Sequence, residues 1–236
     1  MQKTRKKYTV LLLSAPIGSG HRLAAEALEQ AFTDRPEVEV IHGNIFDFFP
    51  QFLGKAFLGT YLWILKCCPW LYKLAYSWGN KQGGSLWLRE LLNRLLARLG
   101  GSYLRSVQPD AVIATHATPA GIIGYYKKQH PKLWLGAVVT DFTIHRWWVC
   151  DGVDTYFIAD ELLRDKLNTD ADIQATGIPV RQQFMIKHDK QKCREFFGWD
   201  ENERVCLLMG GGEGLLPMAE IIAALQRASL KNLRVV

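Results

Sequence analysis

Residues 8–33 read YTVLLLSAPIGSGHRLAAEALEQAFT, a stretch that predicts a buried strand, a glycine turn and a helix in succession. The segment from Tyr8 to Ser14 is an apolar run, which is typical of a strand buried in a parallel sheet. From His21 to Thr33 the apolar residues recur at helical spacing. The stretch therefore predicts the first strand–helix unit of an α/β fold.

The alternation of strands and helices continues along the chain. Similar apolar segments predict strands at residues 37–41, 111–114, 133–139 and 155–158, and helices near residues 85–99, 120–129 and 160–167. Strands that alternate with helices favour a doubly wound parallel sheet. We expect such a Rossmann-like α/β domain over residues 1–180, with an insertion at residues 45–105.

A second domain is expected to begin after this one. The pattern breaks at Thr176-Gly-Ile-Pro179, and the polar residues 181–203 predict a linker. Residues 204–236 then carry a strand, a glycine turn, a helix and the start of another strand. Because lone domains below about 40 residues seldom fold, we interpret this piece as the incomplete start of a second Rossmann-like domain.

The insertion has a one-sided charge. Residues 48–109 carry eight Lys and Arg against one Glu, or +7, whereas the whole chain has a net charge of +6. The neighbouring residues 45–78 contain eleven aromatic side chains. Basic and aromatic residues together are typical of a surface that binds an anionic membrane. The alternatives are an aromatic core with a solvated basic face, or a nucleic-acid surface, for which no recognition motif is present.

The glycine turn of the first unit, Gly18-Ser-Gly20-His21, is a candidate site. Glycines at this place allow a ligand to approach the backbone, and a helix N-terminus favours negative charge. A dinucleotide site would require a small residue where Leu23 stands. His21 at the mouth of the helix is placed to take a proton from a hydroxyl group, or simply to bond to a loop.

Three more polar residues follow predicted strands. His116 comes after residues 111–114, and Asp141 and His145 come after residues 133–139. Ligands of a doubly wound sheet bind beyond the carboxyl ends of its strands, so these residues and His21 are expected to converge there. Metal binding is disfavoured, because the two histidines lack the close spacing of a ligand pair.

The turn Gly210-Gly-Gly-Glu-Gly214 opens the second strand–helix unit. It lacks the Gly-Lys-Ser/Thr end of a P-loop, which disfavours nucleoside triphosphate hydrolysis. A glycine turn that leads into a helix can nevertheless receive a diphosphate. Two such turns in two domains indicate two substrates.

Five segments together resemble a known family. They are Ser14-Ala-Pro-Ile-Gly-Ser-Gly-His-Arg-Leu-Ala-Ala25, Thr115-His116, Val138-Val-Thr-Asp-Phe-Thr-Ile-His145, Thr176-Gly-Ile-Pro-Val-Arg181 and Leu207-Leu-Met-Gly-Gly-Gly-Glu-Gly214. Their order resembles the monogalactosyldiacylglycerol synthase and processive diacylglycerol glucosyltransferase family, and more distantly the N-acetylglucosaminyltransferase of peptidoglycan lipid intermediates.

The resemblance implies a GT-B fold and an inverting, metal-independent transfer of a hexose from a UDP-sugar to a lipid hydroxyl. His21 and Asp141 are the implied catalytic residues, and UDP-sugar is a substrate, so no cofactor is expected. Gly18, Gly20, His116 and His145 are implied to bind the acceptor, diacylglycerol or a related glycolipid. Gly210, Gly211, Gly212 and Glu213 are implied to bind the donor. Arg146 stands where many members have proline, which puts the orientation of His145 in doubt.

Two other functions stay open at this point. One is an NAD(P)-dependent oxidoreductase, and the other is a non-catalytic lipid-binding module. Under the preferred hypothesis the protein is peripheral on the inner, cytoplasmic face of the cell membrane. The 236-residue chain alone is expected to be inactive, since the later donor motifs of the family have no counterpart in it.

Overall fold

The computed structural model describes residues 7–15, 19–48, 86–211 and 216–236, and five single positions between residues 49 and 85. The chain divides into two compact units, residues 1–181 and residues 182–236. Most of the predicted insertion at residues 45–105 lies outside the described residues.

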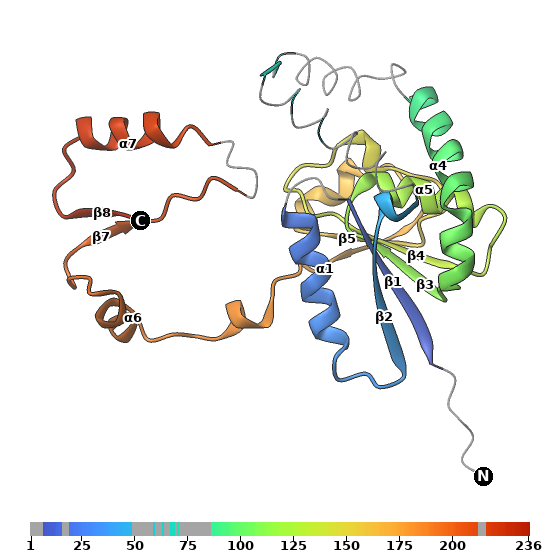
Figure 1. Cartoon of the computed structure of the whole chain (residues 1–236), viewed down its shortest axis with the longest axis horizontal. Helices are drawn as coiled ribbons and strands as arrows, with labels where there is room; N and C mark the ends of the chain where they lie inside the picture. Colours follow the sequence, from blue (N-terminus) through green and yellow to red (C-terminus); the bar gives the residue numbers. More distant parts are fainter. Residues whose placement is uncertain are drawn as a thin grey trace, which may run out of the picture. The chain divides into compact units, whose positions relative to one another are not determined.

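The first unit is built on a parallel six-stranded sheet in the order β2-β1-β3-β4-β5-β6 (Figure 1). The strands are β1 (Tyr8–Ser14), β2 (Val38–Asn44), β3 (Ala111–Ala114), β4 (Trp134–Val138), β5 (Thr155–Ile158) and β6 (Asp172–Ala175). Leu11, Leu12 and Leu13 of β1 are fully buried, as the apolar run predicts. The predicted parallel α/β sheet is confirmed.

Helices cover both faces of this sheet (Figure 1). Helix α1 (Ser19–Phe32) packs on one face over β1 and β2, where Val10 and Leu12 point toward it. Helix α5 (Ala117–Lys127) packs on the other face over β3 and β4, and α4 (Leu86–Val107) packs against α5. Crossover connections on opposite faces make the sheet doubly wound.

Two sequence predictions were wrong in detail. Strand β6 was missed because only Ile173 of its four residues is even partly buried, so the segment has no apolar run. The helix predicted at residues 160–167 is the 3₁₀ helix η3 (Glu161–Lys166). Three other short 3₁₀ helices are η1 (Ile45–Phe48), η2 (Arg146–Trp148) and η4 (Gln182–Met185).

Glycines allow α5 to approach its neighbours closely. A Cβ atom at Gly124 would overlap the backbone carbonyl oxygen of Asp151, and one at Gly121 would lie 2.5 Å from the side-chain nitrogen of Asn93 on α4. Gly121 therefore allows α5 to pack against α4, and Gly124 allows it to pack against the loop that follows β4. This loop carries Asp141 and His145.

Besides η4, the described residues of the second unit form two parallel strands and two α-helices. They are α6 (Lys190–Phe197), β7 (Arg204–Cys206), α7 (Met218–Arg227) and β8 (Leu233–Val235). The order strand, helix, parallel strand is that of a Rossmann-like βαβ unit. Strand β7 is shorter than the predicted run of residues 204–209, since β8 pairs with only three of its residues.

Candidate active site

The candidate site lies where the order of strands in the sheet reverses. From β1 the chain passes through α1 to β2 on one side, whereas β3 and the later strands extend on the other side. Such a switch point at the carboxyl ends of the strands is where doubly wound sheets bind ligands. His21 lies in the first turn of α1, and His116 directly follows β3 as the N-cap of α5. Both histidines therefore lie at the switch point.

The hydrogen bonds of His21 fix its tautomer. Its Nδ1 atom lies 2.8 Å from the carbonyl oxygen of Thr115 and 2.7 Å from the hydroxyl oxygen of Thr140. A carbonyl oxygen can only accept, so Nδ1 carries the proton and donates it. In the neutral ring, Nε2 then holds the lone pair that can accept a proton from a ligand.

His116 lies edge-on against His21, with ring centroids 4.6 Å apart. Its Nδ1 accepts a hydrogen bond of 3.1 Å from the backbone N–H of Thr118 and so caps α5. Burial, reinforced by the nearby His21, lowers the pKa of His116 to about 3. His116 is therefore an uncharged imidazole beside His21 at neutral pH.

Asp141 joins this cluster through a tryptophan. The buried indole of Trp148 donates a hydrogen bond of 3.0 Å from Nε1 to Oδ2 of Asp141. The same indole lies 6.4 Å from the ring of His116, measured between centroids. Asp141 itself is exposed, so its carboxylate is accessible to a ligand. Sequence reasoning missed Trp148, because one tryptophan among eight gives no signal of its own.

The other predicted acceptor residues are placed differently. Nδ1 of His145 accepts a 3.2 Å hydrogen bond from the N–H of Trp147 and thereby caps η2. This contact belongs to the turn that contains His145, not to the His21 cluster. Gly20 lies in the first turn of α1, and no described atom lies within 4 Å of a Cβ atom placed on it. Gly18 lies outside the described residues.

The predicted donor residues belong to the second unit. Gly210 and Gly211 follow β7, and Gly211 has a φ of +72°, a left-handed conformation that suits glycine. Gly212 and Glu213 lie outside the described residues. In the parts of the chain that are described, no three His, Cys, Asp or Glu side chains gather to form a metal-binding cluster.

A cavity of about 520 Å³ lies elsewhere in the first unit, between α1 and the sheet. Its wall is mostly apolar and includes Phe32, Trp134 and Phe157. None of the predicted site residues lines this cavity. The polar cluster around His21 is therefore the better candidate for chemistry.

Comparison with known proteins identifies the family. Residues 21–180 match the sequence model of the family described as monogalactosyldiacylglycerol (MGDG) synthase. The chain belongs to the MGDG synthase family. The resemblance seen in the sequence motifs is confirmed.

Several curated relatives match most of the chain. It is 28% identical over 223 residues to a processive diacylglycerol beta-glucosyltransferase from Bacillus pumilus, covering 90% of this chain and 56% of that protein. It is 28% identical over 249 residues to a probable chloroplastic monogalactosyldiacylglycerol synthase 2 from Oryza sativa, covering 95% of this chain and 50% of that protein. The chain thus spans about half the length of these relatives.

Among solved structures, the chain is similar to UDP-GlcNAc 2-epimerase from Neisseria meningitidis bound to UDP-GlcNAc. The TM-score is 0.49 and the sequence identity is 13%, over 97% of this chain and 71% of the other.

The neutral state of His116 predicts a dependence of stability on pH. Its pKa of about 3 in the folded chain lies below the ordinary value of 6.5. Between these values the unfolded chain binds a proton that the folded chain does not, so the stability contributed by His116 is full above pH 6.5 and falls as the pH falls toward 3. One pH unit below 6.5 the loss should reach about 1.4 kcal/mol.

His116→Asn is the matched variant, because asparagine can cap α5 but does not titrate. Urea unfolding at several pH values should show the gap in unfolding free energy between wild type and variant shifting by about 1.4 kcal/mol between pH 7.5 and pH 5.5. A gap that stays constant over this range would show that His116 titrates normally.

Proposed function

We propose that the protein is a glycosyltransferase that moves a hexose from a UDP-sugar to a membrane lipid, diacylglycerol or a related glycolipid. The observation that carries this proposal is the hydrogen bond from Nδ1 of His21 to the carbonyl oxygen of Thr115. It leaves Nε2 as a base at the mouth of α1, where an acceptor hydroxyl can be deprotonated. Membership of the MGDG synthase family supports the substrate class.

The proposed reaction is an inverting single displacement. Nε2 of His21 takes the proton of the acceptor hydroxyl while the hydroxyl oxygen attacks the anomeric carbon of the sugar. The bond from the anomeric carbon to the diphosphate breaks, and UDP leaves with the electron pair. Backbone N–H groups near Gly210 and Gly211 are proposed to stabilise the charge of the diphosphate. The donor is a substrate, and we propose no further cofactor.

Asp141 and the remaining residues are assigned supporting roles. The exposed carboxylate of Asp141, held by the hydrogen bond from Trp148, is proposed to bind the acceptor. Neutral His116 packs against the ring of His21 and places no positive charge beside it. Gly20 is proposed to leave room for the acceptor.

The oxidoreductase and the lipid-binding module have less support. Leu23 is too large for the dinucleotide turn, and the family matched by residues 21–180 is one of glycolipid synthases. Measuring the binding of UDP and of NAD(P)H separates the two enzyme classes. Turnover with UDP-sugar and diacylglycerol separates an enzyme from a binding module.

His21→Ala, made in the longest natural chain that contains these residues, should lower kcat by about 10²–10⁴-fold, because it removes the base. UDP affinity should stay unchanged, because the proposed donor residues lie in the other unit. Thr140→Val, which removes an acceptor from the Nδ1 proton, should lower kcat less, by about tenfold. The control is His130→Ala, on the exposed surface. Retention of more than about half of the wild-type turnover by His21→Ala would contradict the assignment.

We also propose that the first unit docks on an anionic membrane, at the inner face of the cell membrane. The support is the outer face of α4, defined by the exposed apolar residues Trp87, Leu91, Leu92, Leu95 and Leu99. Its opposite face packs into the protein through Asn93, Ala97 and Leu104. The exposed Arg94 and Arg98 accompany the apolar face, and each adds about 1 kcal/mol near an anionic surface. Of the helices in the described parts of the chain, none is long and apolar enough to cross a membrane.

Arg94→Glu combined with Arg98→Glu should strongly reduce binding to anionic vesicles, since it replaces attraction with repulsion. Co-sedimentation should show wild-type binding that weakens with salt, because surface charges are screened over about 8 Å at physiological ionic strength. The control is Lys132→Glu combined with Lys166→Glu, which makes the same charge change at exposed positions outside α4. Equal loss of binding in both variants would show that the net charge of the protein, and not the face of α4, determines vesicle binding. If the wild type does not bind vesicles, membrane docking is refuted.

A further inference from the structure

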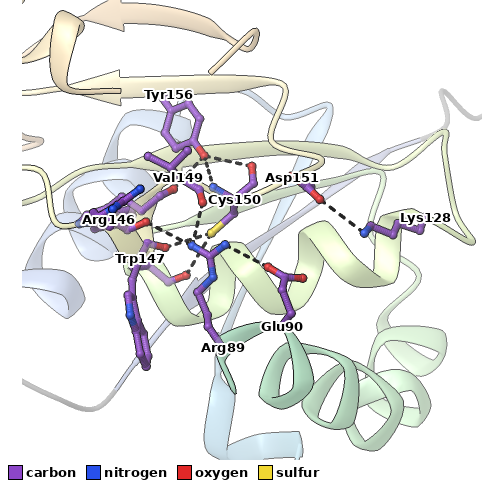
Figure 2. Close-up of polar contacts among 11 residues, drawn as sticks. Arg89, Glu90, Lys128, Arg146, Trp147, Val149, Cys150, Asp151 and Tyr156 are labelled. Carbon is purple, nitrogen blue, oxygen red and sulfur yellow. Dashed lines mark hydrogen bonds and ion pairs between the residues drawn. The ribbon is translucent and has the colours of Figure 1, made fainter. Parts of the chain in front are cut away.

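The turn that follows β4 is held by side chains from other elements. This turn comprises residues 146–150 and contains η2 (Figure 2). Arg89, in the first turn of α4, donates from Nη1 to the carbonyl oxygens of Arg146 and Val149, at 3.2 and 2.9 Å. A guanidinium group thus bridges the first residue of η2 and its C-cap, Val149; at the C-terminal end of a helix the carbonyls need such donors.

The carbonyls between these two ends are bound as well. The hydroxyl of Tyr156 on β5 donates to the carbonyl oxygen of Trp148 at 2.8 Å and accepts from the N–H of Cys150 at 3.0 Å. The thiol of Cys150 donates to the carbonyl oxygen of Trp147 at 3.1 Å. Burial raises the pKa of Cys150 to about 12 and raises that of Tyr156, so both groups keep the protons that they donate.

The side chain of Arg89 is mostly buried next to the turn and paired with a carboxylate. Its side chain is only 12% exposed, and its Nη2 atom donates to Oε1 of Glu90 at 3.0 Å (Figure 2). The carboxylate balances the positive charge, which would otherwise be costly to bury. A planar guanidinium can bind the two carbonyls and the carboxylate together, whereas a lysine ammonium on the same helix would be a single point charge.

The turn carries Trp148, whose indole binds Asp141. The connection runs from Arg89 to the carbonyls of the turn, from the turn to the buried ring of Trp148, and from Nε1 of Trp148 to Oδ2 of Asp141. We propose that Arg89 is a positioning residue that holds the carboxylate of Asp141 in place through this turn. The proposal rests on the proposed function in so far as Asp141 serves the transfer reaction.

The first test measures the turn directly, in the 236-residue chain. Hydrogen exchange followed by mass spectrometry should show about tenfold faster exchange in residues 141–150 of Arg89→Gln, because charge-assisted hydrogen bonds that hold the turn are lost. Peptides from β1 and α5 should keep their wild-type rates. The control is Arg164→Gln, which breaks a surface pair with Glu161. Arg89→Lys keeps the charge and the aliphatic stem, and it carries the test if Arg89→Gln does not fold.

The second test measures turnover in the longest natural chain that contains these residues. Arg89→Gln should lower kcat by about tenfold and leave the KM for the UDP-sugar within about twofold of wild type. Arg89→Lys should recover part of the loss. Because Arg89 acts through Asp141, Arg89→Gln combined with Asp141→Asn should be no slower than Asp141→Asn alone.

The outcomes separate this proposal from the proposed function. Unchanged exchange in residues 141–150, or equal acceleration throughout the chain, would overturn the positioning role. Rate losses that multiply in the double variant would overturn it too, because the two residues would then act independently. If Asp141→Asn leaves glycosyl transfer intact, the acceptor-binding role proposed for Asp141 fails, and the exchange experiment still decides whether Arg89 holds the turn.

Discussion

The hydrogen bond between Nδ1 of His21 and the carbonyl oxygen of Thr115 is the contact on which the candidate site depends. It joins the first turn of α1 to the end of β3, two elements separated by 94 positions in the sequence. Thr115 is held in turn by its N–H, which donates to the carbonyl oxygen of Leu13 on β1 at 3.1 Å. The parallel pairing of β1 with β3 therefore fixes the position of the Thr115 carbonyl oxygen, which binds the proton on Nδ1 of His21.

This arrangement gives the two neighbouring histidines different tasks. His21 keeps Nε2 as a potential base, whereas His116 uses Nδ1 to cap α5. Burial keeps His116 uncharged, so the pair does not place two positive charges 4.6 Å apart. An uncharged neighbour does not oppose the positive charge that His21 acquires when it accepts a proton.

Much of the fold could be predicted from the sequence because its central strands are apolar runs. The same reasoning placed His21, His116 and Asp141 beyond strand ends, since the carboxyl ends of parallel strands share one edge. It could not find β6, whose residues are mostly exposed, nor the 3₁₀ geometry of residues 161–166. The roles of Trp148 and Arg89 could not be predicted from the sequence either, because their contacts depend on side-chain geometry, and Arg89 binds a segment about 60 positions away in the sequence.

Arg89 illustrates why charge counts alone mislead. In the sequence it is one of eight basic residues in a segment that resembles a membrane-binding surface. In the structure it points inward and binds backbone carbonyls, whereas Arg94 and Arg98 on the same helix are exposed. Helix α4 thus combines an outward apolar and basic face with an inward contact to the turn that holds Trp148.

The tautomer of His21 decides whether Nε2 can act as a base, and it can be measured in this chain without substrate. Long-range ¹H–¹⁵N correlation spectra of the imidazole distinguish a protonated from an unprotonated ring nitrogen in the neutral form. We expect Nδ1 of His21 to carry the proton and Nε2 to be unprotonated. A neutral His21 with its proton on Nε2 would contradict the hydrogen bond to Thr115 and, with it, the proposed base.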